Sequence, residues 1–134
     1  MADYKYSGRQ LSPTPWNVLL GELKNKLNNT FSLKINSVLL NWYRDGNDSM
    51  GWHTDDEKEL GSHPVIVSLN LGTSRRFLLR KNSNQKEKIE FQLHQGSLLI
   101  MQGATQHFWQ HSVPKEKSVK RDRINLTFRE IKSN

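Results

Sequence analysis

The sequence predicts a mostly β fold of the α+β type: a double-stranded β-helix, or jelly-roll barrel, supported by one N-terminal helix. Two observations predict the architecture. About seven short segments rich in β-branched and aromatic residues are separated by glycines and polar turns. Only one segment, near the start, carries apolar residues at helical spacing. A third observation, the length of 134 residues, limits the chain to one mid-sized core.

We therefore expect a single domain over residues 1–134. Its predicted parts are an N-terminal arm (1–12), a supporting helix (13–29) and the jelly-roll core (30–134). No internal repeat interrupts this order.

The predicted helix begins in the segment Pro-Thr-Pro, with Thr14 as the N-cap and Pro15 at the first helical position. It ends at the pair Asn28 and Asn29. Its apolar residues recur three and four positions apart, which predicts one face lying on a sheet. These residues are Trp16, Leu19, Leu20, Leu23 and Leu27.

The strands are predicted from loose alternation of apolar and polar residues. Their ranges are 35–44, 64–72, 76–80, 89–93, 97–102, 108–113 and 123–130. Two polar stretches, 81–88 and 114–121, are predicted to be solvated loops between strands.

The composition excludes several classes of protein. The chain has no cysteine, which rules out disulfide scaffolds, thiolate zinc sites and cysteine nucleophiles, so any metal must be held by His and carboxylate. No apolar run approaches the roughly 18 residues of a membrane span, and the start has no apolar core of a signal peptide. We therefore expect a cytoplasmic protein without a membrane segment, and a monomer.

The charge balance points to a polyanionic partner. The chain has 20 Lys and Arg against 13 Asp and Glu, a net charge of +7. A domain this basic is a candidate for nucleic-acid binding. The candidate basic contacts are Arg75, Arg76, Arg80, Lys81, Lys115, Lys117, Lys120 and Arg121.

The last predicted strand separates apolar from polar side chains, because successive residues of a strand point to opposite faces. One face carries Ile124, Leu126 and Phe128; the other carries Arg123, Asn125, Thr127 and Arg129. The pattern alone favours a strand with one core face and one solvent face, which antiparallel sheets commonly show. In the alternative, the polar face lines a barrel mouth. The two guanidinium groups, about 20 Å apart on a flat strand and drawn closer by twist, would then hold a small dicarboxylate.

A candidate metal site lies at residues 53–57. His53 and Asp55 are two residues apart, so they share a face of an extended segment. One further His would complete a two-His, one-carboxylate site, which suits Fe(II) with open coordination positions. Spacing leaves both His107 and His111 as candidates, although His111 falls at a strand end, where barrel sites often lie. His63 lies too close to the first pair, in a turn.

Four segments in order resemble the AlkB family of Fe(II)- and 2-oxoglutarate-dependent dioxygenases. They are 41–46 (Asn-Trp-Tyr-Arg-Asp-Gly), 53–57 (His-Thr-Asp-Asp-Glu), 109–114 (Trp-Gln-His-Ser-Val-Pro) and 123–129 (Arg-Ile-Asn-Leu-Thr-Phe-Arg). The resemblance covers residues 4–131. The closing segment is more diagnostic than His-x-Asp, which the wider superfamily shares.

The resemblance implies that His53, Asp55 and His111 bind Fe(II), leaving positions for 2-oxoglutarate and O2. It also implies five residues that hold the cosubstrate. Arg123 would pair with its distal carboxylate, and Arg129 would lie near the carboxylate beside the keto group. The others are Asn125, Asn41 and Tyr43.

For the substrate, the resemblance implies that Asp56 lies near the exocyclic amine of a damaged base. Tyr4 and Tyr6 match the end of the nucleotide-gripping segment of the family, most of which lies ahead of the matched residues. The implied activity is oxidative dealkylation of bases such as 1-methyladenine and 3-methylcytosine, in DNA or RNA with DNA favoured, with formation of succinate, CO2 and formaldehyde. The alternatives are a hydroxylase or demethylase of the same superfamily acting on protein, lipid or a small molecule, and a non-catalytic nucleic-acid-binding module.

Overall fold

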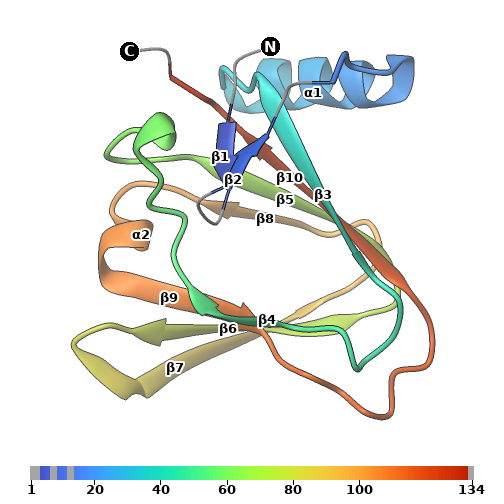
Figure 1. Cartoon of the computed structure of the whole chain (residues 1–134), viewed down its shortest axis with the longest axis vertical. Coiled ribbons are helices and arrows are strands. Elements are labelled where there is room, and N and C mark those ends of the chain that lie inside the picture. The colour runs from blue at the N-terminus through green and yellow to red at the C-terminus, as the bar shows by residue number, and fades with distance from the viewer. Residues whose placement is uncertain (1–3, 7–8, 12–13, 133–134) are drawn as a thin grey trace.

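Two four-stranded antiparallel sheets face each other in the computed structural model, which describes residues 4–6, 9–11 and 14–132 (Figure 1). The main sheet contains, in spatial order, β3 (Ser37–Tyr43), β10 (Arg123–Arg129), β5 (Ile66–Gly72) and β8 (Leu98–Met101). The second sheet contains β4 (Met50–His53), β9 (Trp109–Val113), β6 (Arg75–Lys81) and β7 (Asn84–Leu93). A small hairpin pairs β1 (Tyr4–Tyr6) with β2 (Arg9–Leu11). The helices are α1 (Val18–Phe31), the 3-10 turn η1 (Lys58–Leu60) and α2 (Thr105–Phe108). The predicted fold class is confirmed.

Helix α1 begins later than the sequence predicts. Asn17 is its N-cap, and the side chain of Asn17 accepts a hydrogen bond of 2.8 Å from the backbone N–H of Leu20. This side-chain bond satisfies a backbone donor of the first turn, so the start predicted at Pro15 with Thr14 as the cap is wrong.

The helix also ends later than predicted. Asn28 lies within the helix and does not terminate it. Its side chain accepts a hydrogen bond from the N–H of Ile35 (2.7 Å) and donates one to the C=O of Ile35 (3.1 Å), which holds the segment after the helix in place. The helix ends at Phe31, and Ser32 takes the left-handed conformation with φ 54°. Neither α1 nor any other helix in the described part of the chain has the length and apolarity needed to cross a bilayer.

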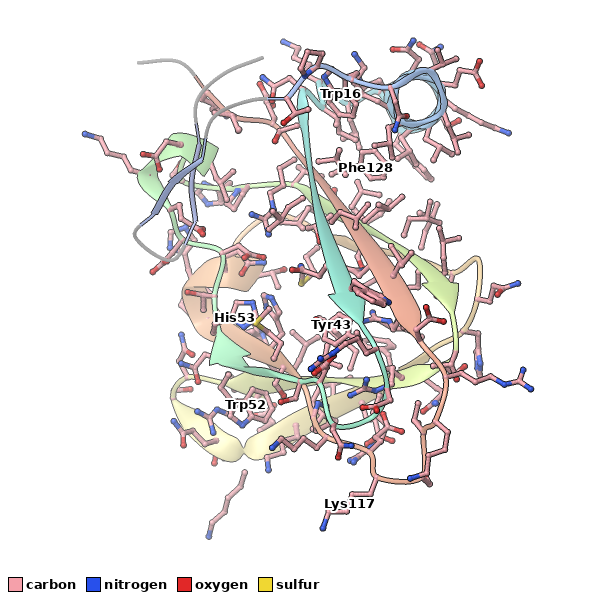
Figure 2. All side chains as sticks on the ribbon, turned by 45° about the vertical axis from the view of Figure 1, so that its right-hand side comes forward. Trp16, Tyr43, Trp52, His53, Lys117 and Phe128 are labelled. Atoms are coloured by element: carbon pink, nitrogen blue, oxygen red, sulfur yellow. The ribbon has the colours of Figure 1, made fainter. Side chains whose placement is uncertain are left out.

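Helix α1 lies on the outer face of the main sheet (Figure 1). Its apolar stripe packs on Leu126, Phe128 and Val67 of the sheet, with Trp16 placed above Phe128 (Figure 2). The stripe consists of Leu20, Leu23 and Leu27, and Trp16, just ahead of the helix, packs against the same cluster. Leu19, predicted to belong to it, is 65% exposed, so that part of the prediction is wrong.

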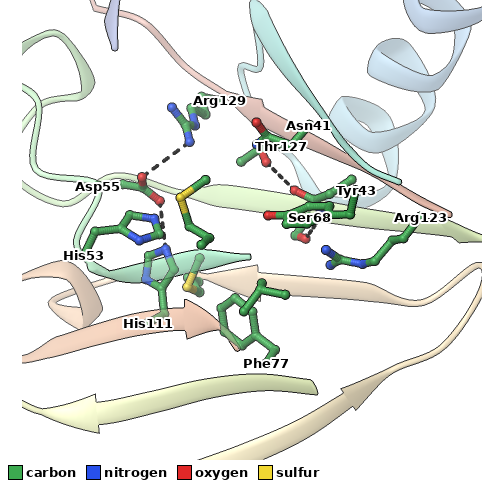
Figure 3. Close-up of a pocket in the computed structure, with 14 residues that line it drawn as sticks. Asn41, Tyr43, His53, Asp55, Ser68, Phe77, His111, Arg123, Thr127 and Arg129 are labelled. Carbon is green, nitrogen blue, oxygen red and sulfur yellow. Dashed lines mark hydrogen bonds and ion pairs between the residues drawn. The ribbon is translucent and has the colours of Figure 1, made fainter. Parts of the chain in front are cut away.

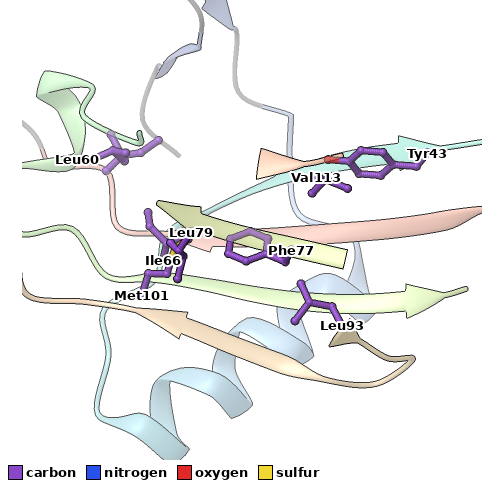
Figure 4. Packing of buried hydrophobic residues seen from close by; sticks show 9 residues of the cluster. Tyr43, Leu60, Ile66, Phe77, Leu79, Leu93, Met101 and Val113 are labelled. Carbon is purple, nitrogen blue, oxygen red and sulfur yellow. The ribbon is translucent and has the colours of Figure 1, made fainter. Parts of the chain in front are cut away.

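A second apolar cluster fills the space between the two sheets beside the polar site described below (Figure 4). It includes Ile66 and Met101 of the main sheet and Phe77, Leu79 and Val113 of the second sheet. Burying apolar side chains from both inner faces holds the sheets together.

The polar stretch 81–88 is largely strand, so the predicted loop is wrong. Lys81 pairs with Asn84, which leaves only Asn82 and Ser83 in the turn. Residues 84–88 of β7 are all polar and exposed, so this half of the strand lacks the apolar alternation that identified residues 89–93. The strand β4 was also not predicted, because four residues that include a glycine form too short a pattern.

Gly46 lies where two loops of the barrel touch. Its N–H donates to the carbonyl of Val119 (2.9 Å), and its own carbonyl accepts from the N–H of Glu116 (2.8 Å). A Cβ at this position would lie 1.6 Å from the carbonyl oxygen of Glu116, which is backbone and has little freedom to move. The segments 44–49 and 114–122 therefore depend on a residue without a side chain at this contact.

We expect Gly46→Ala to lower the free energy of unfolding by about 2–3 kcal/mol, because the added methyl overpacks the contact between the loops. Urea denaturation measures the change. The matched control is Gly21→Ala, where an added Cβ meets nothing within 4 Å inside helix α1. That control should gain about 0.5–1 kcal/mol. Equal effects of the two substitutions would contradict the role of close packing at Gly46.

Candidate metal and 2-oxoglutarate site

His53, Asp55 and His111 form a candidate metal centre between the two sheets (Figure 3). One ligand atom from each lies within 4.8 Å of the others. Strands β4 and β9 place His53 directly opposite His111, and the two ring centres are 4.2 Å apart. The Asp55 carboxylate lies 3.5 Å from Nε2 of His111. The cluster has the two-His, one-carboxylate composition that suits Fe(II).

The structure separates the two histidines that spacing left open. His111 lies on β9 and is buried, whereas His107 lies on the short helix α2 and is exposed. Nε2 of His107 contacts the carbonyl of Ser62, and its ring lies 5.2 Å from that of His63. Only His111 joins the cluster, because the helical turn of α2 directs His107 elsewhere.

Neighbouring groups orient the candidate ligands. Nδ1 of His53 is 2.8 Å from the carbonyl of Gly51, which leaves Nε2 to face the centre. The buried side chain of Gln106 accepts a hydrogen bond of 2.8 Å from the backbone N–H of Asp55. Arg129 lies 3.4 Å from the Asp55 carboxylate. Gln106 was not singled out from the sequence, because a lone glutamine carries no signal of this role.

The polar face of β10 points into the barrel, so the simpler expectation of a solvent face is wrong. All four of its side chains are buried, with exposures of 2% for Arg123, 8% for Asn125, 6% for Thr127 and 4% for Arg129. The opposite, apolar face of the strand packs under α1. The strand is therefore enclosed on both sides.

A hydrogen-bond network orders the polar side chains of β10 that form one wall of the barrel interior. Asn125 donates to Ser68 Oγ (2.6 Å) and to Asn70 Oδ1 (3.0 Å). Asn70 also accepts from Arg123, and Thr127 donates to Asn125 (2.7 Å). Ser68 and Asn70 were not predicted as site residues, although two polar residues alternating within the apolar segment 64–72 were the available signal.

One pocket brings the metal cluster and this wall together (Figure 3). The residues expected to bind metal and cosubstrate all line it: Asn41, Tyr43, His53, Asp55, His111, Arg123, Asn125 and Arg129. Register explains the grouping, since β10 pairs Arg123 with Tyr43 and Asn125 with Asn41. Further lining comes from Met50, Phe77, Met101, Val113, Ser68 and Thr127.

The residues present fit an anionic ligand beside a metal ion. Nε and Nη1 of Arg123 are buried and have no hydrogen-bond partner among the described residues, which is costly unless an acceptor fills the pocket. Burial lowers the pKa of Arg123 and raises that of the adjacent Tyr43 hydroxyl, against the effect of each on the other. A carboxylate would supply the missing acceptor in the forked geometry that arginine favours.

Of the three residues expected to contact a damaged base, the structure describes the side chain of Asp56 alone. Asp56 follows Asp55 directly but is exposed, and it does not line the pocket. Tyr4 and Tyr6 lie in β1, where their side chains fall outside the described residues. Their expected roles stay predictions.

His111 should make the stability of the metal-free protein depend on pH. Burial lowers its pKa from 6.5 to about 4, although the Asp55 carboxylate acts in the opposite direction. Below pH 6.5 the unfolded chain binds a proton here and the folded chain does not, so the free energy of unfolding falls as the pH falls toward 4. Between about pH 7.5 and about pH 5 we expect a loss of about 2 kcal/mol in urea denaturation.

The control for this prediction is His111→Gln, which removes the titrating group. Its loss of stability over the same pH interval should be smaller by that amount. An identical pH dependence in both proteins would show that other groups cause it.

The comparisons with known proteins agree with this geometry. The family model described as the 2OG-Fe(II) oxygenase superfamily matches residues 1–129. Among curated relatives, alpha-ketoglutarate-dependent dioxygenase alkB homolog 3 of Mus musculus is 44% identical over 137 residues, covering 96% of this chain and 48% of the relative. DNA oxidative demethylase ALKBH2 of Homo sapiens is 39% identical over 135 residues, covering 96% of this chain and 52% of the relative.

The solved structure of OsALKBH1 has the same fold, with a TM-score of 0.67 at 20% identity, covering 90% of this chain and 68% of that chain. The chain spans about half the length of the curated relatives it matches. The match over residues 1–129 includes all the strands that carry the candidate metal cluster and the two arginines of β10. The chain therefore belongs to the 2OG-Fe(II) oxygenase superfamily.

Proposed function

We propose that this chain catalyses oxidative dealkylation of N-alkylated bases, of the 1-methyladenine and 3-methylcytosine type, in nucleic acid, with DNA favoured over RNA. The observation that carries the proposal is the pocket in which His53, Asp55 and His111 face the buried guanidinium of Arg123. The names of the relatives, a dioxygenase and a DNA oxidative demethylase, support the reaction class.

In this proposal His53, Asp55 and His111 hold Fe(II). When bound, the metal with 2-oxoglutarate and O2 supplies the oxidation that releases the methyl group as formaldehyde, with succinate and CO2 as co-products. Gln106 and the Gly51 carbonyl keep Asp55 and His53 oriented before any ligand arrives.

The wall of β10 binds and orients the cosubstrate. Arg123 donates hydrogen bonds to the distal carboxylate, beside Tyr43, Asn41 and Asn125 on the paired strands. Arg129 lies at the other end of the pocket, next to Asp55, where it would meet the carboxylate nearer the metal. Two cations at opposite ends of one pocket match a dicarboxylate.

The substrate class rests on charge. Bases alkylated at these positions are cationic, and the exposed carboxylate of Asp56 beside the cluster would attract them. The net charge of +7 provides affinity for a phosphate backbone. A base in a duplex must be flipped out, which damage makes easier because its pairing is already lost.

The test is a mass-spectrometric assay with anaerobically loaded Fe(II), 2-oxoglutarate and a single-stranded oligonucleotide that carries 1-methyladenine or 3-methylcytosine. We expect the loss of one methyl group, with succinate formed in equal amount. Succinate without demethylation would favour a protein, lipid or small-molecule substrate. Oligonucleotide binding with neither product would favour the non-catalytic binding module. The cytoplasmic location, the monomeric state and the single-domain boundaries stay predictions.

A further inference from the structure

The outer face of the second sheet carries an aromatic side chain covered by two cations. We call it the Trp52 face; its residues are Trp52 of β4, Arg80 of β6, Lys88 of β7 and Gln110 of β9. The guanidinium carbon of Arg80 lies 4.4 Å from the Trp52 ring centre, and Nζ of Lys88 lies 5.9 Å from it. Trp52 lies on the outer side of the sheet and His53 on the inner side (Figure 2).

The two cations occupy an unfavourable arrangement for stability alone. Arg80 and Lys88 are directly opposite each other in the β6–β7 pairing, and like charges at opposed positions destabilise a sheet. In the described part of the chain neither forms an ion pair with a carboxylate. By contrast, Arg76 on the same strand is 2.8 Å from Glu90. Contact with the indole offsets part of the repulsion, and an anion placed between the cations would remove it.

Arg80 is already oriented for such an anion. Its Nε donates a hydrogen bond of 2.9 Å to the side chain of Gln110, while the guanidinium lies over Trp52. A guanidinium held in this way presents its remaining N–H groups as a planar fork, which matches phosphate oxygens. Aromatic side chains combined with a basic strip are typical of surfaces that bind single-stranded nucleic acid.

The Trp52 face lies directly behind the metal cluster. Strand β4 is the edge of the second sheet, and adjacent residues of the strand send His53 into the pocket and Trp52 to the other face. The pairing of β4 with β9 shifts between Met50 and His53, an irregularity of the kind that re-aims side chains beside active sites. A single-stranded nucleic acid that places one base in the pocket can therefore continue over the edge of β4.

We propose that the Trp52 face binds the phosphate backbone of the single strand that flanks the target base. This proposal rests on the proposed function, since it takes the nucleic acid from there. The binding site proposed here is separate from the pocket, because none of the four residues of the Trp52 face lines the pocket.

The test compares Arg80→Gln/Lys88→Gln with the wild type by fluorescence anisotropy, with labelled oligonucleotides of about 5 and about 15 nucleotides. For the longer oligonucleotide we expect the dependence of log K on log salt to become shallower by about 1.4, since each lost phosphate contact on a single strand removes about 0.7. The shorter oligonucleotide should change less. Lys88→Gln alone, at an exposed side chain, should lower the slope by about 0.7.

The matched control is Lys26→Gln/Lys34→Gln, which removes the same charge at exposed positions in and just after helix α1, on the far side of the main sheet. Its salt dependence should equal that of the wild type. An unchanged slope in Arg80→Gln/Lys88→Gln, or an equal loss in the control, overturns the proposal.

Stability separates a binding role from a structural one. Because the opposed cations repel each other, the melting temperature of Arg80→Gln/Lys88→Gln should be equal to or higher than that of the wild type. A lower melting temperature with unchanged binding would assign a structural role and overturn the proposal. Demethylation by the wild type is measured alongside. If the wild type does not demethylate but Arg80→Gln/Lys88→Gln still shows the shallower salt dependence, the dealkylase function is rejected and the binding role of the Trp52 face is kept.

Discussion

Replacing His111 with alanine is expected to weaken divalent metal binding by at least about 100-fold and to abolish turnover. Loss of a group that merely orients a ligand typically costs 10- to 100-fold in metal affinity, so loss of a ligand costs more. The substitution leaves His53 and Asp55 as the remaining members of the cluster. Titration of the metal-free protein with Co(II), followed by visible absorption, measures the affinity, and succinate formation measures turnover.

His107→Ala is the matched control, because it removes the same ring four residues earlier in the chain. His107 is exposed on α2 and lies outside the cluster, so we expect metal binding and turnover at the wild-type level. The reverse outcome, with metal lost in His107→Ala and kept in His111→Ala, would reject the site. Both histidines are plausible from spacing alone, and this pair of variants decides between them.

Replacing Arg75 with methionine is expected to lower the free energy of unfolding by about 3–5 kcal/mol. The side chain is fully buried and donates to the carbonyls of Asp45 (3.0 Å), Asp48 (2.8 Å) and Pro114 (2.8 Å). Its Nε lies 3.5 Å from Glu116. The substitution therefore leaves buried acceptors without a partner and removes the side-chain link between the segments 44–49 and 114–122, which the backbone hydrogen bonds of Gly46 still join. Urea denaturation measures the loss.

The neighbouring residue provides the control. Arg76 forms a half-exposed ion pair with Glu90, so Arg76→Met should cost less than about 1 kcal/mol. Arg75→Lys keeps the charge but lacks the forked donors, and should fall between the two. Equal losses for Arg75→Met and Arg76→Met would contradict the role assigned to the buried guanidinium.

Arg75 also shows a limit of sequence reasoning. It was grouped with Arg76, Arg80 and Lys81 as a candidate nucleic-acid contact, and for Arg75 that prediction is wrong, because the side chain has no exposure to a partner. Arg75 and Arg76 are adjacent and identical in type. They differ because the strand sends one inward, against two loops that come from distant parts of the chain.

The closing strand was predictable in one respect and undecided in another. Alternation correctly separates Arg123, Asn125, Thr127 and Arg129 from the apolar residues between them. The pattern alone favoured solvent on the polar side, and the structure places that side inside the barrel. The decision comes from the second sheet, which covers the polar face, and from α1, which covers the other.

The sequence by itself determined the properties that depend on neighbouring residues: the helix, most strands, the exclusion of thiolate chemistry, and the types and spacing of the candidate metal ligands. The tertiary structure alone decided that His111 joins the cluster while His107 leaves it, that two arginines of β10 share one pocket, and that Arg75 is buried. The physical reason is that spacing along the chain sets only the relative directions of side chains. What each side chain meets is set by segments such as 44–49, 66–72 and 114–122, which pairing and packing bring to it.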